Sequence, residues 1–151
     1  MSRTTRRHLI TMPALALAAV LAGCSSSPEI SVATLTQHDW SLTDATDADG
    51  HADTALRGGD RAPIKLSFQA DRLGITNSCN GMGGDYELEN DRLKVGNLMQ
   101  TMMACESELM AREGAIKTRL QQPLRVQFDQ GSSRLTLTND TGIMVFQPAS
   151  D

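Results

Sequence analysis

The chain has 151 residues, a net charge of −4 at pH 7 and an aromatic content of 3%. This length fits one folded domain. The acidic balance and the five aromatic side chains argue against nucleic acid as a partner, because phosphate contacts need clustered Lys or Arg and base stacking needs aromatic platforms.

Residues 1–23 have the pattern of an export signal. Three arginines among the first seven residues precede an apolar run at 14–22 that is too short to span a bilayer as a permanent helix. The sequence LAGC that ends at Cys24 resembles a bacterial lipobox, which implies acylation of this cysteine. Ser25 stands where an Asp would imply retention in the inner membrane. We therefore expect a lipid anchor in the outer membrane of a Gram-negative cell, with the domain facing the periplasm.

The mature chain is more acidic than the full chain. Removing the signal takes away three arginines and no acidic residue, which leaves 11 basic and 18 acidic residues and a net charge of −7. The stretch SSSPEISVA after Cys24 is a polar spacer, so we expect residues 24–35 to be the acylated cysteine and a flexible tether. We place the folded domain at residues 36–149.

Most of the domain has the pattern of short strands. The first is predicted at 38–44, with Trp40 and Leu42 on one face. Residues 45–63 are rich in Asp, Ala and Gly and predict a long surface loop. Seven further segments alternate apolar and polar residues between turn residues, at 64–70, 71–77, 85–90, 91–96, 124–130, 134–140 and 143–148. This pattern predicts antiparallel β-structure, either a barrel or a sandwich.

One segment, residues 105–123, predicts an amphipathic helix. Leu109, Glu113, Ile116 and Leu120 fall on one face at spacings of 4, 3 and 4, and Pro123 ends the segment. A single helix in a β-chain most simply covers or plugs one end of the sheet.

Several short motifs follow one another along the chain. A Trp-x-Leu element at 40–42 and Leu-Ser-Phe at 66–68 lead to a Cys-Asn element followed by Gly-x-Tyr. A Thr-x-Met-Ala-Cys segment comes before the helix, which Glu113 and Leu120 fit, and a hairpin at 135–146 closes the chain. The key positions are Trp40, Cys79, Asn80, Gly84, Tyr86, Thr101, Cys105 and Glu113. Over residues 36–147 this combination resembles the META domain, the family of the heat-shock protein HslJ.

The resemblance implies a small β-barrel of about eight strands with lipocalin-like topology and one helix. It also implies an association with heat shock and with tolerance of the antibiotic novobiocin, and it brings no common activity, ligand or cofactor. We therefore expect a monomeric, non-enzymatic envelope lipoprotein that acts in stress tolerance, with an unidentified envelope protein as its partner.

Two alternative functions stay open. The first is inhibition of a secreted enzyme such as lysozyme, because the loop of lipid-anchored lysozyme inhibitors resembles Ser-Gly-x-x-Tyr. Here Gly83 and Tyr86 are in place, but Met82 stands where Ser is expected. The second is transport of a small apolar ligand inside the barrel.

Cys79 has three possible roles: nucleophile, metal ligand or half of a disulfide. A nucleophile needs a base, and the mature chain offers only His38 and His51, neither within a local signature. Two cysteines 26 residues apart without a Cys-x-x-Cys or a His pair do not form a zinc site. In an exported chain with Cys24 acylated, Cys79 and Cys105 remain as an even pair, which predicts a disulfide.

The other motif residues have structural interpretations. Three glycines, Gly81, Gly83 and Gly84, predict positive φ in a turn or bulge, and Asn80 predicts a side-chain cap of that turn. Glu113 predicts a partly buried carboxylate that accepts hydrogen bonds from backbone N–H groups or the Trp40 indole, with ligand binding as the alternative.

Two surface features complete the sequence-based expectations. The methionine cluster (Met99, Met102, Met103, Met110) is expected to fill core, with copper(I) binding as the alternative. The loop at 45–63 fails as an EF-hand, since its first and last ligand positions are Ala45 and Leu56 when Gly50 is the loop glycine. We expect this loop to be solvated, and we expect no metal and no cofactor.

Overall fold

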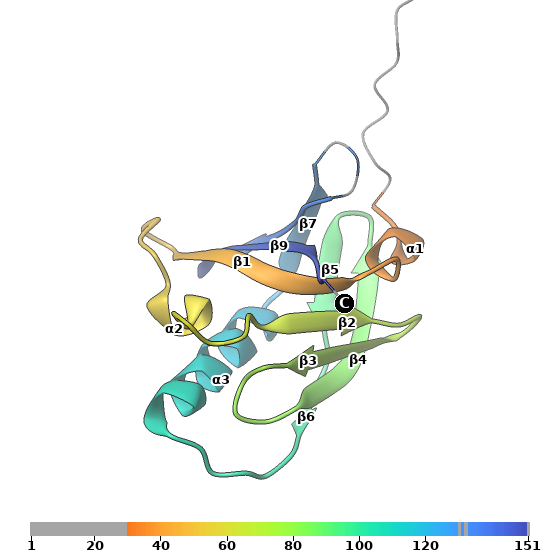
Figure 1. Cartoon of the computed structure of the whole chain (residues 1–151). Coiled ribbons are helices and arrows are strands. Elements are labelled where there is room, and N and C mark those ends of the chain that lie inside the picture. Colours follow the sequence, from red (N-terminus) through yellow and green to blue (C-terminus); the bar gives the residue numbers. More distant parts are fainter. Residues whose placement is uncertain (1–29, 130, 132, 151) are drawn as a thin grey trace, which may run out of the picture.

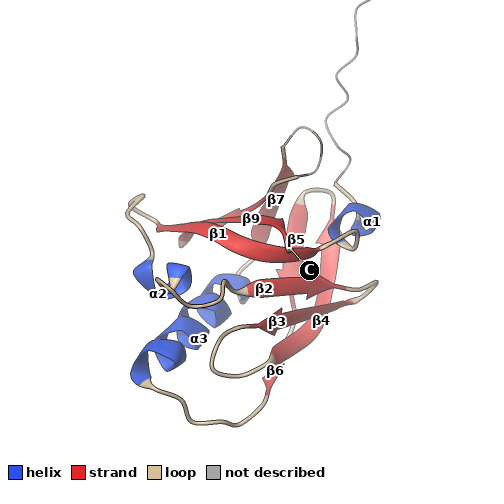
Figure 2. Ribbon diagram, viewed as in Figure 1, coloured by secondary structure: helices blue, strands red, loops and turns tan. Residues whose placement is uncertain are grey.

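The computed structural model describes residues 30–129, 131 and 133–150. The expected signal and Cys24 lie outside these residues. The described chain forms one antiparallel sheet that curls into a closed barrel, with three helices around it (Figures 1 and 2). Its strands are β1 (Asp39–Asp47), β2 (Lys65–Phe68), β3 (Arg72–Thr76), β4 (Met82–Glu89), β5 (Arg92–Val95), β6 (Met99–Gln100), β7 (Leu124–Phe128), β8 (Leu135–Asn139) and β9 (Gly142–Pro148).

The barrel is an up-and-down meander of eight strands. Each strand from β1 to β5 pairs with the next, β5 pairs with β7, β7 to β9 continue the series, and β9 returns to β1. This arrangement confirms the expected mainly β fold with lipocalin-like topology. All eight predicted strands are present. The additional short strand β6 pairs only with β4 and was not predicted.

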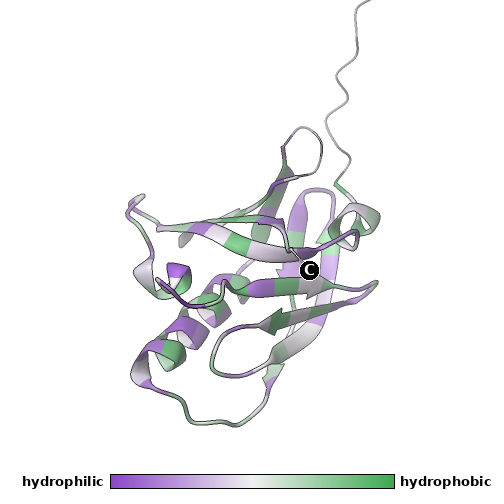
Figure 3. Cartoon of the chain, viewed as in Figure 1, coloured by the Kyte–Doolittle hydropathy of each residue, from purple (hydrophilic) through white to green (hydrophobic). Residues whose placement is uncertain are grey.

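The core fills the inside of the barrel. Buried and more exposed residues alternate along most of the strands, as expected for a sheet with one face inward, and Figure 3 shows apolar and polar colours alternating along the ribbons. Among the fully buried side chains are Trp40, Leu66, Ile75, Leu93, Leu137 and Phe146. The side chains of the barrel itself therefore supply the hydrophobic stabilisation.

The barrel closes between its first and last strands. β1 and β9 pair from Trp40 opposite Pro148 to Asp47 opposite Gly142, with a bulge between Leu42 and Asp44. Beyond the strands, the backbone N–H of Ala149 donates to the carbonyl of Asp39 at 2.7 Å. The start of β1 and the residue after β9 are thus hydrogen-bonded neighbours.

Helix α1 (Val32–Leu35) corrects the expected boundary between tether and domain. Ser31 caps this helix, and Leu35 is completely buried in the core. The carbonyl of Leu35 also accepts the indole N–H of Trp40 at 2.8 Å. The tether expected at 24–35 is therefore too long, because its last residues are part of the folded domain.

The segment at 45–63 is not the long surface loop that its composition predicts. β1 continues to Asp47, and helix α2 (Thr54–Arg57) follows, with Asp53 as its N-cap and Gly58 in the left-handed region after it. Leu56 is fully buried against the core. The turn at residues 48–52 and the irregular segment at 58–63 have the mostly exposed character that was expected.

Helix α3 (Ser107–Leu120) lies across one end of the barrel beside α2 (Figure 1). Three of the predicted inward residues, Glu113, Ile116 and Leu120, are buried, and Leu109 is partly buried. The predicted helix at 105–123 is therefore confirmed with narrower bounds. None of the helices in the described part of the chain is long and apolar enough to cross a membrane.

Candidate functional site

A disulfide joins the segment before β4 to the segment before α3. Cys79 and Cys105 are bonded, with their Cα atoms 5.8 Å apart and a sequence separation of 26. This confirms the predicted pair. Because both sulfurs are in the bond, Cys79 has no thiol to act as a nucleophile or a metal ligand.

Asn80 connects the same two segments through its side chain. Its Oδ1 accepts the backbone N–H of Met103 at 2.8 Å and the hydroxyl of Thr101 at 2.8 Å. Its Nδ2 donates to the carbonyl of Met103 at 3.3 Å. We expected this amide to cap its own turn. Instead, it makes a strand-like pair of hydrogen bonds with the N–H and the carbonyl of Met103.

Glu113 is the buried carboxylate of this network. Its Oε2 accepts the backbone N–H of Asn80 at 2.7 Å, and its Oε1 accepts the amide Nε2 of Gln100 at 3.1 Å. Gln100 is oriented by Lys117, whose Nζ donates to the other amide atom, Oε1, at 3.0 Å. A backbone N–H is thus one of the donors to Glu113, as predicted, but the Trp40 indole is not.

The three glycines of the motif are not positive-φ residues. The described glycines with positive φ are Gly50, Gly58, Gly59, Gly131 and Gly142. Gly84 is required for a different reason: a Cβ there would lie 2.7 Å from the carbonyl oxygen of Asn97. Gly84 therefore allows the backbone of β4 to approach the backbone at Asn97. A Cβ on Gly81, in contrast, would meet nothing within 4 Å.

The two large aromatic residues of the motif belong to the core. Trp40 is fully buried, and its ring packs near Phe128 and the edge of His38. Tyr86 is in the middle of β4 and not at its start, with its ring edge-on to Phe68 and its hydroxyl donating to the carbonyl of Gln69 at 2.6 Å. Burial raises the pKa of the Tyr86 phenol above its ordinary value, and the charge of Asp71 raises it further.

The position of Tyr86 bears on the lysozyme-inhibitor alternative. The residues Met82 to Tyr86 form part of β4, and both end side chains are buried. A loop that inserts a tyrosine into an enzyme cleft needs that side chain outside the fold. This geometry argues against Tyr86 as an inhibitory residue.

The methionines do not fill core, contrary to our prediction. The exposed fractions are 78% for Met99, 92% for Met102, 58% for Met103 and 44% for Met110. Met99 is the first residue of β6, and Met102 and Met103 belong to the irregular segment between β6 and α3, where no alternation places a side chain inward. The copper(I) alternative stays a prediction.

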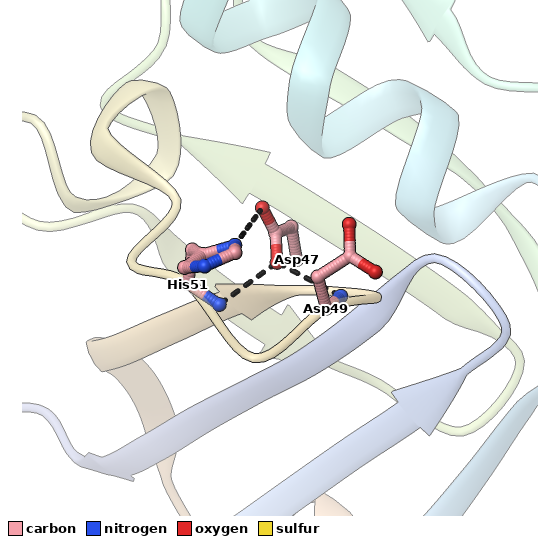
Figure 4. A group of neighbouring side chains, drawn as sticks. All are labelled: Asp47, Asp49 and His51. Carbon is pink, nitrogen blue, oxygen red and sulfur yellow. Dashed lines mark hydrogen bonds and ion pairs between the residues drawn. The ribbon is translucent and has the colours of Figure 1, made fainter.

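The acidic turn brings Asp47, Asp49 and His51 together, with one ligand atom of each within 4.8 Å of the others (Figure 4). Asp47 Oδ1 accepts the backbone N–H groups of Asp49 and His51, at 3.0 and 2.9 Å. These bonds fix the shape of the turn and account for the cluster. Ala45 and Leu56 are buried, so the two failing EF-hand positions are also out of reach of a cation.

Two buried arginines on α3 were missed by the sequence analysis. Arg112 is 2% exposed and donates to the carbonyls of Ala62, Asn77 and Leu56, at 2.9, 3.1 and 3.3 Å. Burial lowers the pKa of its guanidinium, and the charge of Arg61 lowers it further. Arg112 thus connects α3 with α2, with the loop between α2 and β2 and with the loop after β3, and it lies beneath a surface groove of about 690 Å³ between α2 and α3.

Arg119 connects α3 to β1 and to the N-cap of α2. Its Nη2 donates to the Asp53 carboxylate and to the carbonyl of Thr46, both at 2.8 Å. Arg112 and Arg119 are at spacings of 4 and 3 from Ile116, so their positions on the inward face of the helix were visible in the sequence. Arginine is almost never fully buried unless it is paired, so the helical spacing alone did not indicate their burial.

The META domain family profile matches residues 33–151. The chain belongs to the META domain family. The match begins within α1, in agreement with the position of Leu35 in the core. No curated protein sequence matches the chain.

Two solved structures support the fold of this META protein. One, an NMR structure of a protein from Burkholderia xenovorans, is 22% identical, with a TM-score of 0.65 over 97% of this chain and 100% of that one. A second NMR structure is also 22% identical, with a TM-score of 0.59 over 79% of this chain and 95% of that one. At these identities the likeness concerns the fold alone.

Proposed function

We propose that this META protein is a non-enzymatic lipoprotein of the bacterial envelope, anchored in the outer membrane through Cys24. It would support tolerance of heat or of an antibiotic such as novobiocin by binding another envelope protein. The observation that carries the proposal is the Cys79–Cys105 disulfide in a chain whose N-terminus has the pattern of a lipoprotein signal. META membership supports a stress-related role.

The chemistry of the motif network favours a binding role over catalysis. Cys79 is held in the disulfide, and the buried carboxylate of Glu113 is occupied by donors from Asn80 and Gln100. A general base needs a free lone pair directed at a substrate. The network instead holds one surface segment in a fixed conformation.

Lipid labelling tests the anchor. Cells that express the full chain are grown with a clickable palmitate analogue and then fractionated. We expect label in the outer-membrane fraction for the natural chain and none for Cys24→Ser. Label that persists in Cys24→Ser, or a natural chain found unlabelled in the soluble fraction, would contradict the anchor.

A deletion strain tests the stress role. We expect lower survival at high temperature or in novobiocin, restored by the natural gene and restored poorly by Cys24→Ser. Turnover of a peptidoglycan or peptide substrate by the purified protein would argue for an enzyme. Equal survival of the deletion and parent strains under both stresses would reject the proposed role.

A further inference from the structure

The segment from Met99 to Cys105 continues an edge of the sheet. β6 pairs with β4 on one side, and within the described chain no strand pairs with its other side. An unpaired edge is a template for strand addition by another chain. We call residues 99–105 the methionine edge.

Beyond β6, the segment is irregular, but hydrogen-bonded and unbonded peptide groups alternate over residues 101–103. The N–H of Thr101 donates to the carbonyl of Gly81 at 3.1 Å, and both peptide groups of Met103 bond to the Asn80 side chain. Within the described residues, the N–H and carbonyl of Met102 make no hydrogen bond to the chain. Alternate peptide groups are therefore held inward, and the one between them faces solvent.

This edge is both fixed and apolar. The Asn80 amide and the Cys79–Cys105 disulfide hold it at its centre and at its end. Met99, Met102 and Met103 are nevertheless more than half exposed. Thioether side chains are flexible and polarisable, and they adapt to differently shaped apolar partners.

The end of the methionine edge is acidic. Glu106 and Glu108 both pair with Arg61, so two carboxylates share one cation there. The described chain is acidic overall, with 11 basic and 16 acidic residues among residues 30–150. A second copy of this chain would bring like charge to this end, whereas a basic segment would complement it.

We propose that the methionine edge binds an extended segment of a partner protein by strand addition. The segment would pair its backbone with Met102, place apolar side chains on the methionines and present a Lys or Arg to Glu106 and Glu108. This rests on the proposed function, since it specifies how the envelope partner is recognised. In Figure 1 the chain between β6 and α3 is at the opposite end of the molecule from α1, the first helix of the described chain.

A displayed library of random twelve-residue peptides provides the probe. The full chain, purified in detergent, is the bait, and the triple variant Met99→Ser/Met102→Ser/Met103→Ser is used for counter-selection. We expect enriched peptides with alternating apolar residues and a basic end. They should bind the triple variant at least tenfold more weakly and the control Ile143→Ser, an exposed apolar residue on β9, unchanged.

Two further measurements separate strand addition from simple apolar contact. N-methylation of alternate amides in one enriched peptide should weaken binding at least tenfold, because it removes the donors to the edge. In methyl spectra of the natural chain, the signals of Met99, Met102 and Met103 should shift on binding, while that of the buried Met144 should not. An unchanged thermal midpoint shows that the triple variant is folded.

The proposal is overturned by an absence of enrichment, by peptides that bind the triple variant equally well, or by binding that tolerates N-methylation. A concentration-dependent dimer with these methionines in its interface would assign the edge to a second copy and also overturn it. Peptide binding by the purified chain does not depend on where the protein is anchored. A failure of lipid labelling and a failure of peptide binding are therefore distinguishable.

Discussion

Glu113 on α3 accepts the backbone N–H of Asn80 at 2.7 Å, and both residues are at least 95% buried. This bond connects the helix to the segment that leads into β4. Because Asn80 in turn holds Met103, a single buried carboxylate fixes the relation between the barrel, the helix and the methionine edge.

Replacing this carboxylate tests the network. Glu113→Gln places an NH₂ group where the oxygens accept from Asn80 and Gln100, so one buried donor loses its acceptor. We expect a loss of about 1–3 kcal/mol in the free energy of unfolding, measured by urea titration. Glu108→Gln, an exposed residue on the same helix, is the control and should change stability by less than about 0.5 kcal/mol. Equal effects of the two variants would show that the buried network contributes nothing.

Reduction of the disulfide should destabilise the domain. The bond closes a loop of 26 residues, for which the chain-entropy relation gives about 3.5 kcal/mol. The thermal midpoint of the natural chain should fall in dithiothreitol to that of Cys79→Ser/Cys105→Ser, whose own midpoint should not respond. A natural chain that melts identically with and without reductant would contradict this account.

Gly84 and Gly81 should respond differently to alanine. Gly84→Ala drives a Cβ against the Asn97 carbonyl and should lower stability by about 1–3 kcal/mol. In Gly81→Ala the new Cβ lies in open space, and the backbone there does not have positive φ. The free energy of unfolding of this variant should therefore be within about 0.5 kcal/mol of that of the natural chain. Urea unfolding of both variants measures the contrast, and a large effect at Gly81 with none at Gly84 would reverse the assignment.

Tyr86 should make stability depend on alkaline pH. Its folded pKa is raised above the ordinary value of 10.0, so its contribution is full below pH 10 and is lost as pH rises through the folded pKa. Tyr86→Phe should be less stable at pH 8 by about 1 kcal/mol, since the bond to the Gln69 carbonyl is lost. The stability gap between the two proteins, measured in urea from pH 8 to 11, should narrow above pH 10. A constant gap would contradict the burial of the phenol.

The strands were predictable because each has one face in the core and one in water. Trp40 and Leu42 on β1, or Leu135 and Leu137 on β8, alternate with polar residues for that reason. The disulfide was predictable from cysteine counting. The family motifs implied the barrel, and the order of the strands along the chain is also their order around it.

The errors have physical causes that composition does not show. α2 is one turn long, too short for a helical period, although Asp53 and Gly58 mark its ends. Met102 is in an irregular segment without alternating apolar and polar side chains, so its apolar character did not indicate whether it is buried. The close approach at Gly84 depends on where the chain after β5 returns, which is a property of the folded structure.

The pairing of β1 with β9 sets the order in which the barrel can form. Trp40 also pairs with Pro148, more than a hundred residues later, so in a chain that emerges N-terminus first β1 can pair with β2 but keeps its other edge unpaired until β9 is available. Closing such a distant contact is slow compared with forming hairpins. Until then, this edge of β1 is open to chaperones and to aggregation, and a truncation that removes only β9 leaves β1 with β2 as its one partner and the barrel open.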